Sequence, residues 1–206
     1  MKRHPASPER RELYGFLARL WVKELDGEVA ARLEGDLGRQ LLPAFAGSGE
    51  PQRVADAAER QSTFDADYAQ LTMVRLSPYE SFFRREDAQI EAGAANPLST
   101  FLKRYGLEAD LAAARALSPD HLGIELEAMA ELCRQEVAAA RAGNHPSAGT
   151  VRQVERALLE EHLLTWAPTY LLAARRAAKT ELYRELADAT LHFLLADHES
   201  LCEAAG

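Results

Sequence analysis

Three side chains able to move a proton or bind a metal lie close together near the middle of the chain. Asp120 adjoins His121, and Glu125 follows four residues later. On a helix, His121 and Glu125 would share a face, because residues four apart are neighbours on its surface. These residue types are compatible with a metal site, an acid–base pair, or a hydrogen-bonded helix start without chemistry.

A metal site requires a ligand spacing that this sequence does not have. A di-iron site in a helical bundle needs Glu-x-x-His pairs, so that two ligands one turn apart face the same ion. No histidine here has an acid three residues before it, and no two histidines are three to five residues apart. Cys133 and Cys202 match no metal or redox spacing. We therefore expect no metal site and two reduced cysteines that pack in the interior.

Catalysis is also poorly supported. Adjacent helical residues point about a third of a turn apart, so Asp120 is badly placed to orient His121. There is no Gly-Lys dipeptide for a phosphate loop and no Gly-x-Ser-x-Gly nucleophile elbow. We expect a protein that is not an enzyme, and a helical hydrolase using His121 with Asp120 or Glu125 is kept as an alternative.

The structural alternative for the cluster is a helix start. Ser118 would cap the helix, Pro119 would take its first position, and Asp120 would lie in the first turn, where a negative charge is favourable. His121 would then hydrogen-bond to Glu125. On local grounds this alternative is favoured over a functional polar rim beside a groove.

A second polar group lies at residues 161–168. His162 and Trp166 share a helix face with Val154 and Leu158, and that face is apolar. A histidine and a tryptophan on such a face are more often packed core residues than ligands.

The elements that must position these residues are helices almost throughout, so the sequence predicts an all-α fold in a single domain of 206 residues. Ser77-Pro78 and Asn96-Pro97 are helix breakers, which predict a long connection at 75–97. We expect this connection to act as a hinge between helical halves at about 1–74 and 98–206. The expected helices lie at about 8–25, 28–45, 52–73, 98–105, from 118 to 142, and at 150–166, followed by a helical pattern to 202 that breaks near Lys179-Thr180.

The charge balance indicates which partners to expect. The chain has 32 acidic and 24 basic side chains and a net charge of -8, which disfavours nucleic acid and favours basic partners. No apolar segment with a cleavage site follows the basic N-terminal residues, and the longest uncharged run, 162–174, is too short to span a bilayer. We expect a cytoplasmic protein without stable membrane insertion.

Four stretches in this order resemble a known family: Asp67-Tyr68-x-x-Leu71, Ser77-Pro-Tyr-Glu-Ser81, Pro119-Asp-His-Leu-x-x-Glu-Leu126 and Glu161-His-Leu-x-x-Trp-x-Pro168. The chain resembles the TorD family of redox-enzyme maturation chaperones, which includes the DmsD and NarJ types. The motifs cover about half of the chain, and its length and helical order agree with the family.

The resemblance implies a chaperone that binds the twin-arginine signal peptide, or the apo form, of a molybdopterin oxidoreductase and delays export until the cofactor is inserted. It implies no tightly bound cofactor, with transient contact to the molybdenum cofactor and weak guanine-nucleotide binding left open. A peptide receptor of this kind needs acids beside an apolar groove. By position, Asp120 and Glu125 would bind the arginine pair, His121 would orient them, and Glu80 would be a further acid of the rim. The residues of the apolar wall would be Tyr68, Leu71 and Tyr79.

A structural role is implied for the remaining motif residues, which would fix the last helices against the groove: Pro119, Glu161, His162, Trp166 and Pro168. The remaining alternative is an all-helical scaffold or regulatory protein that binds an amphipathic partner helix without any export or maturation role. A monomer is the default expectation, and a domain-swapped dimer is the alternative, since a long connection allows halves to exchange.

Overall fold

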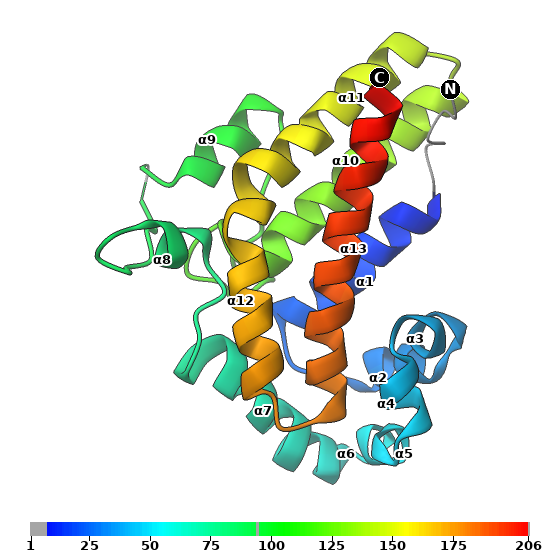
Figure 1. The fold of residues 1–206 in the computed structure, drawn as a ribbon, viewed down its shortest axis with the longest axis vertical. Helices are drawn as coiled ribbons and strands as arrows, with labels where there is room; N and C mark the ends of the chain where they lie inside the picture. Colours follow the sequence, from blue (N-terminus) through cyan, green and yellow to red (C-terminus); the bar gives the residue numbers. More distant parts are fainter. Residues whose placement is uncertain (1–7, 94, 206) are drawn as a thin grey trace. The chain divides into compact units, whose positions relative to one another are not determined.

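The protein is all-helical in the part of the chain that the structure describes. This computed structural model describes residues 8–93 and 95–205, and these contain helices joined by loops and turns, with one isolated bridge between Tyr79 and His121. The all-α prediction is confirmed. Figure 1 shows the course of the chain.

The helices differ widely in length, and three π-helical segments (η1–η3) lie between α-helices. The first part of the chain contains α1 Pro8–Val22, α2 Gly27–Glu34, α3 Asp36–Leu41, α4 Pro43–Gly47, α5 Glu50–Ala55, α6 Ala57–Glu59, η1 Arg60–Phe64, α7 Asp65–Ala69 and η2 Gln70–Val74. The second part contains α8 Glu80–Arg84, α9 Pro97–Arg104, α10 Leu122–Arg141, α11 His145–Leu158, η3 Leu159–Leu163, α12 Leu164–Ala177 and α13 Glu181–Ala205.

By their contacts, the residues group into two compact units that are each discontinuous in sequence. Unit 1 comprises Met1–Val22, Tyr79–Ala167 and Leu194–Gly206, and unit 2 comprises Lys23–Pro78 and Pro168–Phe193. These units differ from the sequential halves expected from the breakers, because α12 and α13 each contribute residues to both. A single domain with a hinge at 75–97 stays a prediction.

In unit 1, α10 packs along α1 on one side and along α11 on another (Figure 1). The approach to α1 is close because Gly123 has no side chain. A Cβ at this position would lie 2.2 Å from Val22 Cγ2 and 3.2 Å from the Ala18 carbonyl oxygen. Glycine at this position therefore allows the two helices to pack directly against each other.

A buried arginine joins four helices of unit 1. Arg10 of α1 donates to both carboxylate oxygens of Asp197 of α13, to Glu155 of α11 at 2.7 Å, and to Glu136 of α10 at 3.4 Å. Tyr14 donates to the same Asp197 at 2.6 Å. Buried carboxylates are tolerated only when they are paired and hydrogen-bonded, so this network fixes α1 against the other helices.

Unit 2 is held together by carboxylates that accept hydrogen bonds from amides at the starts of helices or just before them. Asp67 accepts from the amides of Lys179 and Thr180, and Glu50 accepts from the first two amides of α13. Glu185 of α13 accepts from the amides of Ala44 and Phe45 at the start of α4. These first amides have no partner inside their own helix, so the acids satisfy donors that would otherwise be unpaired.

Two helices expected from the sequence are interrupted in the structure. The helix expected at about 28–45 is divided into α2, α3 and α4, with breaks at Gly35 and at Leu42 before Pro43. The helix expected at about 52–73 is broken at Asp56, whose side chain caps α6, and then passes through η1 and η2. Each break coincides with a residue that favours a helix terminus.

Other expectations agree with the structure. The connection at 75–97 contains one short helix, α8, and the helix expected at 98–105 is α9, which ends before Gly106. The break expected near Lys179-Thr180 separates α12 from α13. The loop expected before residue 150 is shorter, because Asn144 caps α11 and that helix already begins at His145.

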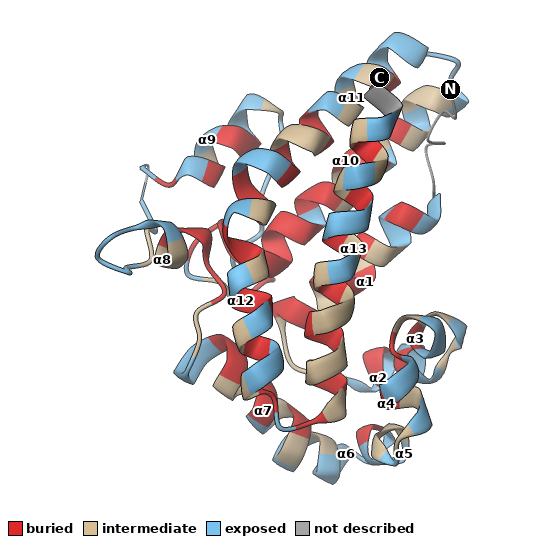
Figure 2. Cartoon of the chain, viewed as in Figure 1, coloured by how far each residue is buried: buried red, intermediate tan, exposed pale blue. Residues whose placement is uncertain are grey.

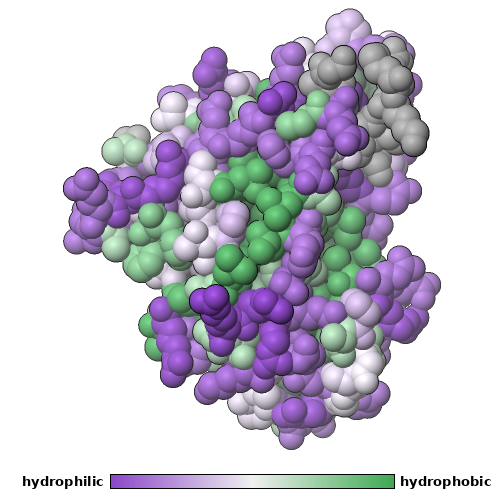
Figure 3. Space-filling view, in the orientation of Figure 1, coloured by the Kyte–Doolittle hydropathy of each residue, from purple (hydrophilic) through white to green (hydrophobic). Residues whose placement is uncertain are grey.

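The surface is mainly hydrophilic on the face drawn in Figure 3, where apolar side chains gather over α12 and α13. Leu172 of α12 and Leu195 of α13 are among the exposed large apolar residues. Among residues 8–93 and 95–205, no helix has the length and apolar character needed to cross a membrane.

Candidate functional site

Helix α10 begins later than the sequence indicated, and a different residue caps it. His121 is the N-cap, and its Nδ1 accepts a hydrogen bond from the Gly123 amide at 3.1 Å. The prediction that Ser118 caps this helix and that Asp120 lies in its first turn is therefore wrong. Ser118 instead donates to the Glu91 carbonyl and accepts from the Asn96 amide group.

Asp120 caps another helix. Its Oδ2 accepts from the Ser81 amide at 2.7 Å, and its carbonyl oxygen accepts from the Glu80 amide at 2.9 Å. These are the first two amides of α8, whose own N-cap residue, Tyr79, supplies no side-chain acceptor. Asp120 therefore attaches α8 to the segment that precedes α10.

Three acids form a buried carboxylate cluster in unit 1, consisting of Glu80, Asp120 and Glu125, all fully buried. Glu80 pairs with His162 Nδ1 at 2.8 Å and also with Arg84. Trp166 donates its indole N–H to Glu125 at 3.2 Å, whereas His121 accepts from the Gly123 amide. These two contacts replace the hydrogen bond expected between His121 and Glu125. The cluster links α8, α10, η3 and α12, and the first turns of α10 are drawn as buried in Figure 2.

Burial controls the protonation of this cluster. Burial raises the pKa of Glu125 well above its ordinary value, and the negative charges of Glu80 and Asp120 raise it further. Burial lowers the pKa of His121 to about 4, although Asp120 opposes this shift. At neutral pH His121 is therefore uncharged, which agrees with Nδ1 accepting a hydrogen bond, and Glu125 favours its protonated form.

The site residues predicted from the sequence belong to both units. In unit 1, Tyr79 stacks edge-on against His121 with ring centroids 5.0 Å apart, and its hydroxyl accepts from the Leu117 amide. In unit 2, the ring centroids of Tyr68 and Tyr183 lie 6.1 Å apart, and the carbonyl oxygen of Leu71 accepts from the Tyr170 hydroxyl.

Every side chain predicted to contact the peptide is buried in this structure: Tyr68, Leu71, Tyr79, Glu80, Asp120, His121 and Glu125. The expectation that Asp120 and Glu125 belong to a polar rim beside a groove is therefore wrong, because both side chains are fully buried. Whether these residues contact a peptide stays a prediction.

The motif residues expected to be structural are placed as follows. His162 and Trp166 are buried as expected, with the ring of Phe101 edge-on to His162 at 5.0 Å and the ring of Phe83 at 5.6 Å from Trp166. Glu161 is exposed, and its carbonyl oxygen accepts from Arg84. Pro119 is buried, and Pro168 lies inside α12 without ending it.

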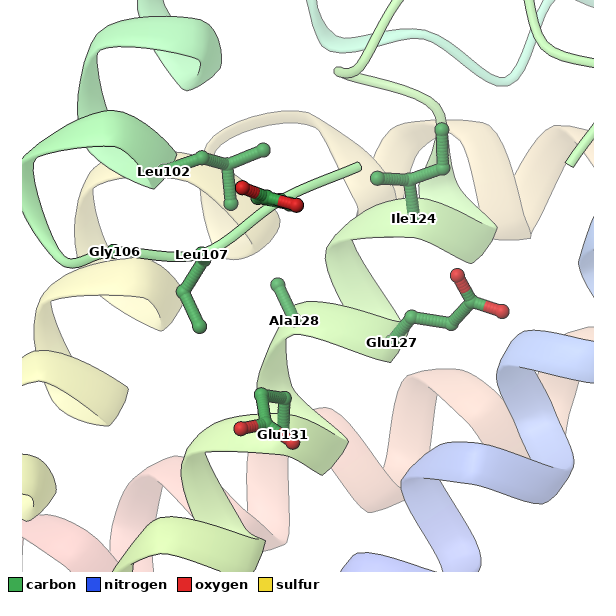
Figure 4. Close-up of a pocket in the computed structure, with 8 residues that line it drawn as sticks. Leu102, Gly106, Leu107, Ile124, Glu127, Ala128 and Glu131 are labelled. Carbon is green, nitrogen blue, oxygen red and sulfur yellow. The ribbon is translucent and has the colours of Figure 1, made fainter. Parts of the chain in front are cut away.

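An open groove is present on another face of α10. It has a volume of about 410 Å³, and Figure 4 shows Leu102 of α9 and Leu107 facing Ile124 and Ala128 of α10. A second hollow of about 490 Å³ shares Leu102, Gly106, Leu107 and Glu108 with it. We call the two together the α9–α10 groove, and its floor is apolar.

Acidic residues surround this floor. Glu108, Glu127 and Glu131 line the first hollow, whereas Lys103 is the one basic residue that lines the second. Glu131 is paired with Arg134 at 2.6 Å, which lowers the pKa of its carboxyl. Glu108 and Glu127 are exposed and make no ion pair with the residues that the structure describes. Partial burial of its carboxyl, with the nearby charge of Asp110, raises the pKa of Glu127.

The sequence contains a signal for this groove that the motif-based prediction missed. Ile124 and Ala128 are four apart, as are Glu127 and Glu131, so α10 presents an apolar row beside an acidic row. The motif-based prediction instead selected Glu125 on the buried face of this helix and Asp120 in the buried segment before it.

The structure therefore combines an all-helical fold with a groove that has acidic residues at its rim. The model of the nitrate reductase delta subunit family matches residues 24–172. Neither the comparison with curated proteins nor that with solved structures gives a match. The chain belongs to the nitrate reductase delta subunit family, the NarJ and TorD group of chaperones that act in the maturation of molybdoenzymes.

This membership settles the question of catalysis. The family is one of chaperones and is not catalytic, so the hydrolase alternative does not apply. His121 and Asp120 also have separate hydrogen-bond partners. The Nδ1 of His121 accepts from the Gly123 amide, and the Oδ2 of Asp120 accepts from the Ser81 amide. The family acts with molybdoenzymes of the nitrate reductase type, which supports a molybdoenzyme as the partner.

Proposed function

We propose that this protein is a cytoplasmic chaperone that binds the twin-arginine leader of a molybdopterin oxidoreductase, or its apo form, and delays export until the cofactor is inserted. The observation that carries the proposal is the α9–α10 groove, with an apolar floor and the carboxylates of Glu108 and Glu127 at its rim. The leader has a basic start followed by an apolar segment able to form a helix, and these are the complementary chemical features.

The charges favour this occupant. Carboxylates that lack an arginine partner within the protein are available for a bidentate pair with a guanidinium of the leader. The net charge of -8 would also accelerate the encounter with a basic peptide. The apolar segment of the leader would lie against Leu111, the exposed large apolar side chain of the second hollow, and over the small exposed parts of Leu102 and Leu107.

The buried carboxylate cluster has a positioning role in this proposal. Glu125 and Asp120 hold α10 and α8 in place, and the groove residues of α10 depend on that placement. Direct contact of Asp120 and Glu125 with the arginine pair would require these buried groups to become exposed. We propose no tightly bound cofactor and a monomer as the working state.

The alternative occupant is an amphipathic helix of a regulatory partner, without any export or maturation role. A synthetic leader containing Ser/Thr-Arg-Arg-x-Phe-Leu-Lys and its apolar segment distinguishes the two when it is titrated into the full chain. Replacement of both arginines by alanine should weaken binding about 100-fold, since a hydrogen bond to a charged group contributes about 1.5–3 kcal/mol. Equal affinity for the two peptides would overturn the proposal and leave the scaffold alternative.

A further inference from the structure

Three side chains with metal-binding atoms meet in unit 1, although they are distant in the sequence. His198 and Cys202 lie four residues apart on α13, and Glu160 comes from η3. Their ligand atoms all lie within 4.8 Å of one another. The search of the sequence for pairs of histidines or pairs of cysteines did not reveal this group, because it mixes three residue types from two segments.

The helix geometry explains why two of the ligands point the same way. Residues four apart share a helix face, which is the same spacing that lets two histidines of one helix hold a zinc ion in metalloproteases. Here the second position is a thiol. The Cys202 Sγ lies 3.5 Å from the His198 Nε2, and the same nitrogen lies 2.9 Å from the Glu160 Oε1.

These separations are close to those of a tetrahedral zinc site. Zinc bonds of about 2.3 Å to sulfur and about 2.0 Å to nitrogen place the two ligand atoms about 3.5 Å apart at a tetrahedral angle. The nitrogen and a carboxylate oxygen would be about 3.3 Å apart, and His198 Nε2 and Glu160 Oε1 lie 2.9 Å apart. The Glu160 side chain is exposed and can rotate to adjust its distances to the nitrogen and to the sulfur.

We propose that Glu160, His198 and Cys202 form a three-ligand site for a borderline divalent cation, with Zn²⁺ as the preferred ion and the fourth position open to water. Nitrogen, thiolate and carboxylate ligands together suit zinc better than the hard cations Mg²⁺ and Ca²⁺, which take oxygen ligands. The bound ion would tie the end of α13 to η3, in addition to the Arg10 network within the same unit.

One nearby charge sets the affinity of this site. Arg156 donates to the same Glu160 Oε1 at 2.8 Å, so it competes with the cation for that oxygen and repels it. Removal of Arg156 should therefore strengthen binding, whereas removal of Arg134, which pairs with Glu131 on another part of the surface, should strengthen only nonspecific binding. Arg156→Gln keeps a polar side chain at this exposed position and is the informative variant.

The test is a titration of metal-free full-length protein with Co²⁺ and Zn²⁺. Co²⁺ should produce a thiolate-to-cobalt charge-transfer band that disappears in Cys202→Ser and persists in Cys133→Ser. In competition with a chromophoric chelator, Zn²⁺ affinity should fall at least about tenfold in Glu160→Gln, His198→Ala and Cys202→Ser, since even changes around the ligands of metal sites cost 10- to 100-fold.

Two control variants distinguish Zn²⁺ binding at these three ligands from nonspecific binding of the ion to the surface. His192→Ala removes another histidine of α13, whose Nδ1 contacts only a backbone carbonyl, and should leave the affinity unchanged. Arg156→Gln should raise it. An absent thiolate band, or equal Zn²⁺ affinity in the wild type and in His198→Ala and Cys202→Ser, would overturn the proposal. Circular dichroism establishes that each variant is folded, and leader binding plays no part in the outcome.

Discussion

At the scale of single residues, His121 is kept uncharged by burial while it caps α10. Between pH 6.5 and about 4 the unfolded chain takes up a proton at this residue, and the folded chain does not. Stability therefore falls as the pH drops through this window and levels off below it. The shift corresponds to a loss of about 3 kcal/mol.

The first prediction isolates this contribution. His121→Asn keeps a side-chain acceptor for the Gly123 amide but cannot titrate. We expect the free energy of unfolding of the variant to decline less than that of the wild type between about pH 6.5 and 4. Urea unfolding across this range measures the difference. His192→Asn, at an exposed histidine, is the control, and an identical decline in wild type and His121→Asn would contradict the interpretation.

The ionisation of Glu125 makes the free energy of unfolding depend on pH in the opposite direction. Its pKa is raised in the folded chain, so the folded state holds a proton that the unfolded state releases above its ordinary pKa, and stability is lost as the pH rises. Glutamine is isosteric with the protonated acid and can still accept from Trp166.

The second prediction follows from this isosterism. Glu125→Gln should stabilise the protein by more than about 1 kcal/mol near pH 7.5 and have little effect near pH 4, where both side chains are neutral. Urea unfolding at the two pH values measures this, with the exposed Glu28→Gln as the matched control. Destabilisation of Glu125→Gln at neutral pH would show that the ionised form of Glu125 is required.

At the scale of elements, the contact between α1 and α10 depends on Gly123. The third prediction is that Gly123→Ala destabilises the protein by about 1–3 kcal/mol, because the new methyl group would overlap Val22 and shift two packed helices. Thermal or urea unfolding measures the change.

Gly15 of α1 supplies the matched control. A Cβ at Gly15 meets nothing within 4 Å, so Gly15→Ala should stabilise α1 by about 0.5–1 kcal/mol through helix propensity alone. Equal effects of the two substitutions would show that close packing at Gly123 is unimportant.

The fourth prediction concerns the attachment of α1. Arg10→Met leaves Glu136, Glu155 and Asp197 buried without their shared cation and should cost about 3–5 kcal/mol. Arg11→Met, at the exposed neighbouring position, should change stability by less than about 0.5 kcal/mol. Chemical denaturation of both variants tests this, and similar losses would show that the network does not hold α1.

The starts of α9 and α10 show which helix boundaries can be predicted from the local sequence and which cannot. Asn96 and Pro97 mark the start of α9 locally, and the sequence located that helix correctly. The start of α10 was misplaced because serine is a stronger N-cap than histidine in general. Here the carboxylate and the carbonyl of Asp120 bind amides of α8, which lie about 40 residues earlier, and no local pattern contains that contact.

At the scale of the whole molecule, the family and the all-α fold were both accessible from the sequence. The order of the motifs identified the family. Several motif residues are hydrogen-bonded to one another in the interior, where His162 pairs with Glu80 and Trp166 donates to Glu125. For the same reason the motifs did not locate the groove. Residues that identify a fold by its core need not be those that contact a ligand at the surface.

The excess of acidic side chains is also a property of the whole molecule. Many of its carboxylates are engaged in capping helices or in ion pairs, including Asp67, Glu50, Glu185 and Asp120. The net charge therefore says little about where a basic partner binds. The acids that remain exposed beside an apolar floor, Glu108 and Glu127, are more informative.

The most direct measurement is the affinity of a fluorescent twin-arginine leader for three double variants, of which the two at exposed positions change the net charge equally. They are Glu108→Gln with Glu127→Gln at the groove rim, Asp120→Asn with Glu125→Gln in the buried cluster, and Glu28→Gln with Glu34→Gln on exposed α2. We predict a loss of at least about tenfold for the rim variant, and a change of at most about twofold for the α2 variant. Unchanged affinity of the rim variant, with loss confined to a folded Asp120 and Glu125 variant, would contradict this account.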